Sequence, residues 1–486
     1  FTAAMLITFV ALYLAVSIAA GLIAATRVHN ARDYISAGRN LPLYIVTAMV
    51  FATWFGAETV LGISATFLKE GMRGLVSDPI GASLCLILFG LLFARPLYRL
   101  NLLTIGDYYR LRYGRLVELV AAVCIVISYL GWVSAQITAL GLVFNLLSQD
   151  AISTSAGMLI GAAVVLTYTI FGGMWSVAIT TFIQMIVIVL GLFYIMTVAG
   201  DMAGGFGNLV RHAADAGKFA VLPEETSWAA SVGFVAALIT MGFGSIPQQD
   251  VFQRANSSRS ERTAVWGSVL GGGAYFLFAF VPLLLAYSAT LIDPAAVERL
   301  AEADPQHILP RLILDHMSPL AQVVFFGALL SVIMSTASGT LLAPSVIFSE
   351  NIVRGTMKNV SEDQLLRLTR FAVFGFTVLV TGYALNTDSS IHKMVENAYK
   401  ITLVAAFVPL AAGLYWRRAS NQGAILSALA GLMVWIACEI AAPEGDVPPQ
   451  FAGFLASVIG MLAGSLLPQW IAPAGDAAAG QAHGHG

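Results

Sequence analysis

The stretch FATWFGAETVLGIS, Phe51 to Ser64, interrupts an apolar segment that is otherwise long enough to cross a bilayer. Gly56 and Glu58 lie in its middle. Inside hydrocarbon no water can satisfy freed backbone N–H and C=O groups, so irregular backbone survives there only where it lines a cavity enclosed by protein. An ionisable side chain at this depth costs about 3 kcal/mol or more and marks a functional site by default. The break therefore predicts a binding site.

The composition indicates an all-α polytopic membrane protein, with the lipid bilayer as its partner. Hydrophobic residues make up 58% of the chain and charged residues 11%, with a mean hydropathy of +0.81, whereas soluble domains carry roughly 25% charged residues. A net charge of −2 gives no basis for binding nucleic acid. We expect no enzyme, because the sequence offers no His or Cys cluster, nucleophile elbow, phosphate loop or paired-carboxylate motif.

Apolar runs of about 20 residues predict the transmembrane spans. We expect about 13 of them, near residues 3–25, 42–68, 75–95, 117–147, 154–171, 175–200, 227–245, 263–290, 319–350, 365–386, 391–416, 421–441 and 449–472.

The basic residues predict the orientation in the membrane. Alternate loops between these spans hold 17 of the 25 Lys and Arg, and cytoplasmic loops are the ones enriched in these residues. The loops at 201–226 and 291–318 are acidic instead. We expect a multi-pass protein of the cell inner membrane with its N-terminus outside and its C-terminus in the cytoplasm.

A second interruption occurs at ITMGFGSIPQQDVFQR, Ile239 to Arg254, where Gly242, Gly244 and Pro247 precede a run of amides. Pro removes a backbone donor and Gly loosens a helix. This break comes five spans after the first, so the two broken helices run in opposite directions across the membrane. That pattern is typical of inverted-topology repeats, which place solute and ion sites at their interface.

Oxygen donors for a hard cation such as Na⁺ are available near these breaks. Unwound helices free backbone carbonyls, and carbonyl and hydroxyl oxygens suit hard cations. The segment SVIMSTASGTLLAPSVIFSENI, Ser331 to Ile352, concentrates hydroxyls, including the adjacent pair Ser335 and Thr336. Ser and Thr in membrane helices also bond to their own backbone, but the adjacent pair favours an ion site with five oxygens.

With these features, the chain resembles the sodium/solute symporters, which include sodium-coupled glucose, proline, sialic acid and choline transporters. The resemblance covers roughly residues 30–420 and is carried by YTIFGGMWSVAITTFIQ, IPQQDVFQR and VIMSTASGT. It implies a LeuT-type fold with 5+5 inverted-topology repeats and Na⁺ as the coupling ion. It also implies a Na⁺ site built from carbonyls of Ala52, Phe55 and Val332 and hydroxyls of Ser335 and Thr336.

The resemblance divides the chain into five parts. They are an extra helix and cytoplasmic loop at 1–41, the first repeat at 42–200, the second at 227–416, two additional helices at 417–472 and a disordered tail at 473–486.

One departure from the family concerns the number of ions. Thr181 stands where the family signature usually has Asp, and Gly339, beside Ser338, is its partner on the eighth core helix. These positions help to form an additional Na⁺ site in some members. We therefore expect a single Na⁺ per cycle.

The solute site resembles the choline-transporter branch. ATWFGA and GWVSAQITALG are similar to that branch's first and third core helices, so Trp54 and Trp132 match its cation-binding aromatics. A quaternary ammonium is held by aromatic faces, each desolvated contact giving about 2 kcal/mol. The third aromatic of that cage is Gln248 here, and an amide invites a solute with hydrogen-bonding groups. The remaining solute contacts are expected from Glu58, Thr59, Gln136 and Lys400.

Three questions stay open at this point. Lys400, four residues after Glu396, could form a helical ion pair, pair with Glu58 or hold a solute carboxylate. The solute could thus be a small amine, a carboxylate or an amino acid, with Na⁺ or H⁺ coupling. Finally, the same fold can serve as the sensing part of a larger signalling protein.

We expect a monomer, with oligomers possible. Asp78, next to Pro79, is expected to be a cap or turn residue.

Overall fold

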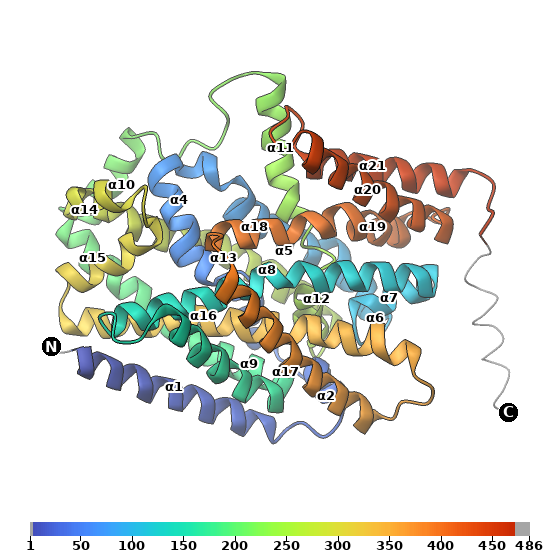
Figure 1. Ribbon diagram of the computed structural model, residues 1–486, viewed down its shortest axis with the longest axis horizontal. Helices are drawn as coiled ribbons and strands as arrows, with labels where there is room; N and C mark the ends of the chain where they lie inside the picture. The colour runs from blue at the N-terminus through green and yellow to red at the C-terminus, as the bar shows by residue number, and fades with distance from the viewer. Residues whose placement is uncertain (1–2, 472–486) are drawn as a thin grey trace.

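A computed structural model describes residues 3–471 of the chain. The predicted tail at 473–486 lies outside this range. The described part is a bundle of helices, and its one β-type pairing joins Leu41 to Ser258. Long helices run side by side along the bundle, with α1 on one edge and the α20–α21 pair at the opposite corner (Figure 1).

The helices fall into long spans and shorter pieces. The long ones are α1 (Ala3–Ala25), α8 (Arg115–Leu147), α9 (Thr154–Met202), α13 (Glu261–Ile292), α16 (Pro319–Ile347), α17 (Glu362–Asn386), α20 (Asn421–Ala441) and α21 (Pro449–Leu466). The shorter ones are α2 (Ala31–Ser36), α3 (Leu43–Phe51), α4 (Ile63–Glu70), α5 (Ala82–Leu88), α6 (Ala94–Arg99), α7 (Ile105–Tyr113), α10 (Phe206–Asp215), α11 (Trp228–Gly242), α12 (Gln249–Asn256), α14 (Pro294–Leu300), α15 (Ile308–His316), α18 (Ile391–Thr402) and α19 (Val408–Tyr415).

The predicted count of 13 spans is not confirmed, since 10 described helical stretches are long and apolar enough to cross a membrane. Two pairs of predicted spans are joined. Residues 154–171 and 175–200 are both numbered α9, in which two helices meet at Gly173, whose backbone is non-helical with φ 49° and ψ −131°. The part of 42–68 that follows the first break joins 75–95 in one stretch, Glu58–Arg99. The predicted span at 227–245 is the short helix α11, because the second break ends it.

Both predicted breaks are present in the structure. Helix α3 ends at Phe51, and helical structure resumes with a π-helical turn at Glu58–Gly62 that leads into α4. Helix α11 ends at Gly242 and α12 begins at Gln249. Gly244 is required in this second break, because a Cβ there would lie 2.2 Å from the Thr240 carbonyl oxygen and 2.6 Å from that of Tyr399.

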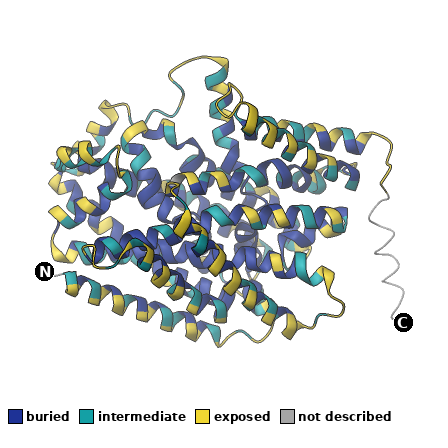
Figure 2. Cartoon of the chain, viewed as in Figure 1, coloured by how far each residue is buried: buried dark blue, intermediate teal, exposed yellow. Residues whose placement is uncertain are grey.

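The packing matches a protein that is surrounded by lipid. Buried residues fill the centre, while α1, α17, α20 and α21 expose one face (Figure 2). Large apolar side chains occupy these exposed faces: Phe9 is 48% exposed, Phe371 75% and Ile440 79%. Such faces need an apolar solvent, so the chain is a multi-pass membrane protein. The boundaries predicted for its five parts stay a prediction.

Candidate functional site

The first break points two backbone carbonyls at a hydroxyl of α16. The Ala52 N–H still makes the regular helical bond to the Ala48 carbonyl, whereas the Gly56 N–H donates to the Trp54 carbonyl at 2.8 Å. The carbonyl oxygens of Ala52 and Phe55 each lie 3.3 Å from Thr336 Oγ1. One side chain of α16 thus gathers the oxygens that the break has freed.

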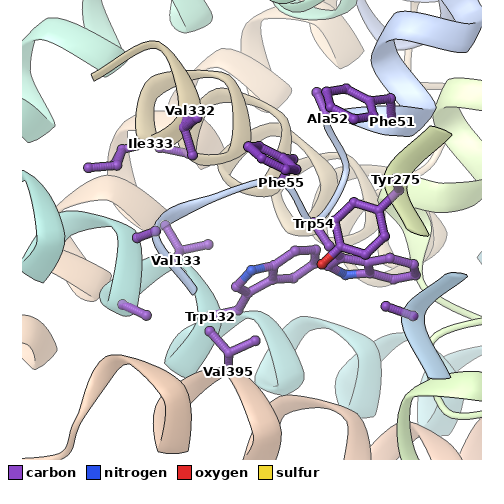
Figure 3. Packing of buried hydrophobic residues seen from close by; sticks show 14 of the residues in the cluster. Phe51, Ala52, Trp54, Phe55, Trp132, Val133, Tyr275, Val332, Ile333 and Val395 are labelled. Atoms are coloured by element: carbon purple, nitrogen blue, oxygen red, sulfur yellow. The ribbon is translucent and has the colours of Figure 1, made fainter. Parts of the chain in front are cut away.

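The neighbouring hydroxyl extends this group of oxygens. Ser335 Oγ lies 3.0 Å from the Val332 carbonyl oxygen, one turn earlier on α16. All five residues are fully buried. Oxygens about 2.4 Å from a hard cation and at right angles lie roughly 3.4 Å apart, so the observed spacings suit neighbouring ligands of one ion. Figure 3 shows Val332 and Phe55 facing each other across this place.

Three aromatic rings form a cage beside the same break. The rings of Trp54 and Trp132 are 6.3 Å apart, and Tyr399 of α18 lies 6.2 Å from Trp54 and 5.6 Å from Trp132. Tyr129 stacks on Trp132 at 5.8 Å. The two indoles lie close together in Figure 3. The third ring beside Trp54 and Trp132 is therefore Tyr399, which the sequence did not predict, and not residue 248, which is Gln in this chain.

Glu58 lies fully buried next to this cage. Its Oε1 accepts a hydrogen bond from Trp132 Nε1 at 3.1 Å, and its Oε2 accepts one from Gln136 Nε2 at 2.7 Å. Gln136 Oε1 in turn accepts from the Ala57 N–H at 3.0 Å. The predicted residues Trp132, Gln136 and Glu58 are thus brought together, and all three are anchored to the break.

Thr59 fastens the break to the far side of the site. Its hydroxyl donates to the Trp54 carbonyl at 2.6 Å and lies 3.3 Å from Tyr275 Oη. The Tyr275 hydroxyl donates to Asp78, which is 3% exposed. Asp78, expected to be a cap or turn residue, has non-helical backbone angles, with φ −142° and ψ 119°, and its side chain also has this partner in α13. Nothing in its local sequence signals a partner 197 positions away.

The other two predicted solute contacts are placed differently. Gln248 uses its amide nitrogen to bond Ser128 Oγ at 3.2 Å and Thr402 Oγ1 at 3.1 Å, which ties the second break to α8 and α18. Lys400 is half-buried on α18, and the ion pairs described between residues 3 and 471 do not join it to Glu58. The structure does not bring Lys400 into the cage.

A buried cation lies on the other side of the ion site. Arg254 of α12 is 1% exposed and donates to the Met49 carbonyl at the end of α3. Its guanidinium packs on Gly339, where a Cβ would lie only 2.1 Å from Arg254 Nη2. Gly339 therefore makes room for the guanidinium of Arg254.

A cavity of about 530 Å³ approaches the cage from the side of the acidic loop at 291–318. It begins at Gly62 and Ala65, one turn beyond Glu58, and opens between Lys69 and Glu302. Because the three rings of the cage are fully buried, this cavity stops short of them.

Several known proteins are similar to this chain in sequence. The sequence model of the Sodium:solute symporter family matches residues 34–431. The chain is 27% identical to the high affinity choline transporter 1 of Homo sapiens over 467 residues, covering 89% of this chain and 76% of that one. It is 25% identical to the high-affinity proline transporter PutP of Bacillus subtilis (strain 168) over 466 residues, covering 92% and 95%.

Solved structures give the same fold. A Na⁺-coupled sialic acid symporter in a substrate-bound outward-open state superposes with a TM-score of 0.81 at 20% identity, covering 96% of this chain and 98% of that one. MhsT in complex with L-phenylalanine gives a TM-score of 0.56 at 15% identity, covering 87% and 98%. These likenesses confirm the predicted LeuT-type fold.

Proposed function

Because the chain belongs to the sodium:solute symporter family, we propose that it couples the movement of one Na⁺ to that of one small organic cation of the ammonium class. The observation that carries this choice is a fully buried carboxylate, Glu58, hydrogen-bonded to a ring of an aromatic cage. Aromatic faces and a carboxylate both attract an ammonium group. The choline transporters among the relatives favour the same class.

Sodium binds at the five oxygens of Ala52, Phe55, Val332, Ser335 and Thr336. The 3.3 Å spacings around Thr336 support this assignment. Occupancy would hold the two halves of the broken helix together and so order Trp54 and Glu58 for the solute. Coupling of this kind is reciprocal, so the solute raises Na⁺ affinity by the same factor.

One Na⁺ per cycle is supported by Arg254. Its guanidinium lies against Gly339, and a fixed positive charge there disfavours a second cation nearby. Thr181, in place of an acidic residue, supplies no compensating charge.

The second candidate solute is an amino acid or small carboxylate, which the proline transporters among the relatives favour. Glu58 argues against it, because two carboxylates repel each other in a buried site. An amino acid would have to place its ammonium group at Glu58 and its carboxylate elsewhere. Proton coupling is the corresponding alternative for the ion.

The location follows from the basic loops. We propose the cell inner membrane, with the N-terminus outside, the C-terminus in the cytoplasm and the cavity at Glu302 facing outward. The monomer is the proposed working unit. A role as the sensing part of a larger protein stays an alternative.

A thermal-shift screen of the purified protein tests the class of solute. Choline, betaine, proline and lactate are each added with Na⁺ and, separately, with K⁺. We expect stabilisation by choline that is larger in Na⁺ than in K⁺. Stabilisation by lactate or proline alone would support the second candidate and contradict the ammonium class.

A further inference from the structure

The two oxygens of the Glu58 carboxylate face different parts of the site. Oε1 accepts from the indole of Trp132, a ring of the cage. Oε2 accepts from Gln136, whose own oxygen accepts from the backbone of Ala57 within the break. One carboxylate therefore has one oxygen on the solute side and one on the side of the unwound backbone.

The second oxygen lies close to the ion site. A Cβ built on Gly56 would lie 2.5 Å from Glu58 Oε2 and 2.8 Å from Thr336 Oγ1. The carboxylate oxygen and the hydroxyl oxygen are therefore no more than about 5 Å apart, a distance at which charges interact strongly in a low-dielectric interior. Because residue 56 is Gly, no side chain separates them.

We propose that Glu58 serves both cargoes, with Oε2 stabilising the Na⁺ at Thr336 and Oε1 stabilising the ammonium group in the cage. This inference rests on the proposed function and deepens it, because it makes a nominal solute residue part of the ion site. The five oxygens proposed as Na⁺ ligands are all uncharged carbonyls and hydroxyls. Glu58 would add a carboxylate beside them.

The hydrogen bonds of Glu58 leave room for this double role. An ionised carboxylate has about four acceptor sites, and two of them are used by Trp132 and Gln136. Gln136 also fixes where Oε2 lies, because the same amide holds the Ala57 N–H. When Na⁺ orders the break, the Gln136 amide, which is bonded to both the Ala57 N–H and Glu58 Oε2, therefore also fixes the position of the carboxylate. Glu58 thus provides a physical route by which Na⁺ prepares the solute site.

The test is Na⁺ binding in the absence of any solute, measured by titration calorimetry on the purified protein. Glu58→Gln keeps the size of the side chain and removes its charge. We expect its Na⁺ dissociation constant to rise about 10- to 100-fold. A Na⁺ affinity within twofold of the wild type, together with weaker choline binding, would overturn the shared role and leave Glu58 to the solute alone.

Two further variants protect this test. Glu444→Gln makes the same chemical change in the exposed loop between α20 and α21 and should leave Na⁺ affinity unchanged. If Glu58→Gln does not fold, Gly56→Ala provides the test, since its methyl group would push Oε2 and Thr336 Oγ1 apart. Gly56→Ala should weaken Na⁺ binding several-fold, and unchanged affinity would contradict the inference.

Failure of this inference is distinguishable from failure of the proposed function. If the wild-type protein itself binds no Na⁺, the proposed function is wrong and the shared role falls with it. If the wild type binds Na⁺ and Glu58→Gln binds it equally well, only the shared role is wrong.

Discussion

At the scale of single residues, Thr336 is the point where α16 meets the first break. Its hydroxyl lies 3.3 Å from both the Ala52 and the Phe55 carbonyl oxygens, so it links α16 to the break. Ser335 adds a second hydroxyl beside it. Removing these oxygens would leave only backbone ligands for Na⁺.

The double variant Ser335→Ala and Thr336→Ala should therefore raise the Na⁺ concentration for half-maximal uptake at least about tenfold, because hard cations need their oxygen ligands. Thr336→Ser, which keeps the hydroxyl, is the matched control. Its Na⁺ concentration for half-maximal uptake should stay within about threefold of the wild-type value. Uptake kinetics at varied Na⁺ measure both. Unchanged Na⁺ dependence in the double variant would place the ion elsewhere.

The cage makes a second prediction at this scale. Trp54→Leu removes one desolvated aromatic face, worth about 2 kcal/mol, and should weaken choline binding about 30-fold. Tyr399→Phe keeps the ring and removes a hydroxyl without a hydrogen-bond partner among the described residues, so it should bind choline about as well as the wild type. Equilibrium binding of labelled choline measures both. Equal affinity in Trp54→Leu would exclude the cage as the ammonium site.

The sequence predicted the residues of the first break and, through the family resemblance, their neighbours on α8 and α16, but it did not predict the contacts made by Tyr399, Tyr275 and Asp78. Trp54 and Glu58 could be predicted because they lie in the interrupted stretch itself. Tyr399, Tyr275 and Asp78 could not, because their roles depend on helices that are far apart in the sequence and meet only in the fold. Lys400 was a reasonable prediction from charge and depth, yet its helix turns Tyr399 toward the cage and leaves Lys400 half-buried.

At the scale of elements, the second break depends on a glycine that lies against the backbone of two helices. A Cβ at Gly244 would collide with the carbonyl oxygens of Thr240 and Tyr399, which cannot move without displacing their helices. The breaks were predictable because Gly, Pro and charge stand out within apolar runs. The number of spans is not confirmed, because two pairs of predicted spans are joined in single helical stretches.

Gly244→Ala should therefore lower the melting temperature of the purified protein in detergent and weaken choline binding. Overpacking against fixed atoms costs about 1 to 3 kcal/mol. The matched control is Gly233→Ala on α11, where a Cβ would meet nothing within 4 Å. The melting temperature of Gly233→Ala should equal or exceed that of the wild type, because Ala favours a helix over Gly by about 1 kcal/mol. Equal melting temperatures for the wild type and Gly244→Ala would contradict the fixed geometry of the second break.

At the scale of the whole molecule, the protein is a helical bundle in which two helices that run in opposite directions are broken, and one Na⁺ site is proposed at the first break. One Na⁺ and one monovalent cation would move two positive charges per cycle. The reversal potential of choline transport in proteoliposomes should therefore correspond to one Na⁺ per choline. A ratio of two would show that Arg254 and Gly339 do not exclude a second ion.

The central claim is that a Na⁺ gradient drives the uptake of an ammonium solute through the site at the first break. Uptake of labelled choline into proteoliposomes, with Na⁺ outside and K⁺ inside, tests it most directly. We expect choline to accumulate above its equilibrium level and this accumulation to collapse when the Na⁺ gradient is removed. The accumulation should also be lost when Ser335 and Thr336 are both replaced by Ala. Accumulation that is equally strong in K⁺ on both sides, or no accumulation of choline at all, would contradict it.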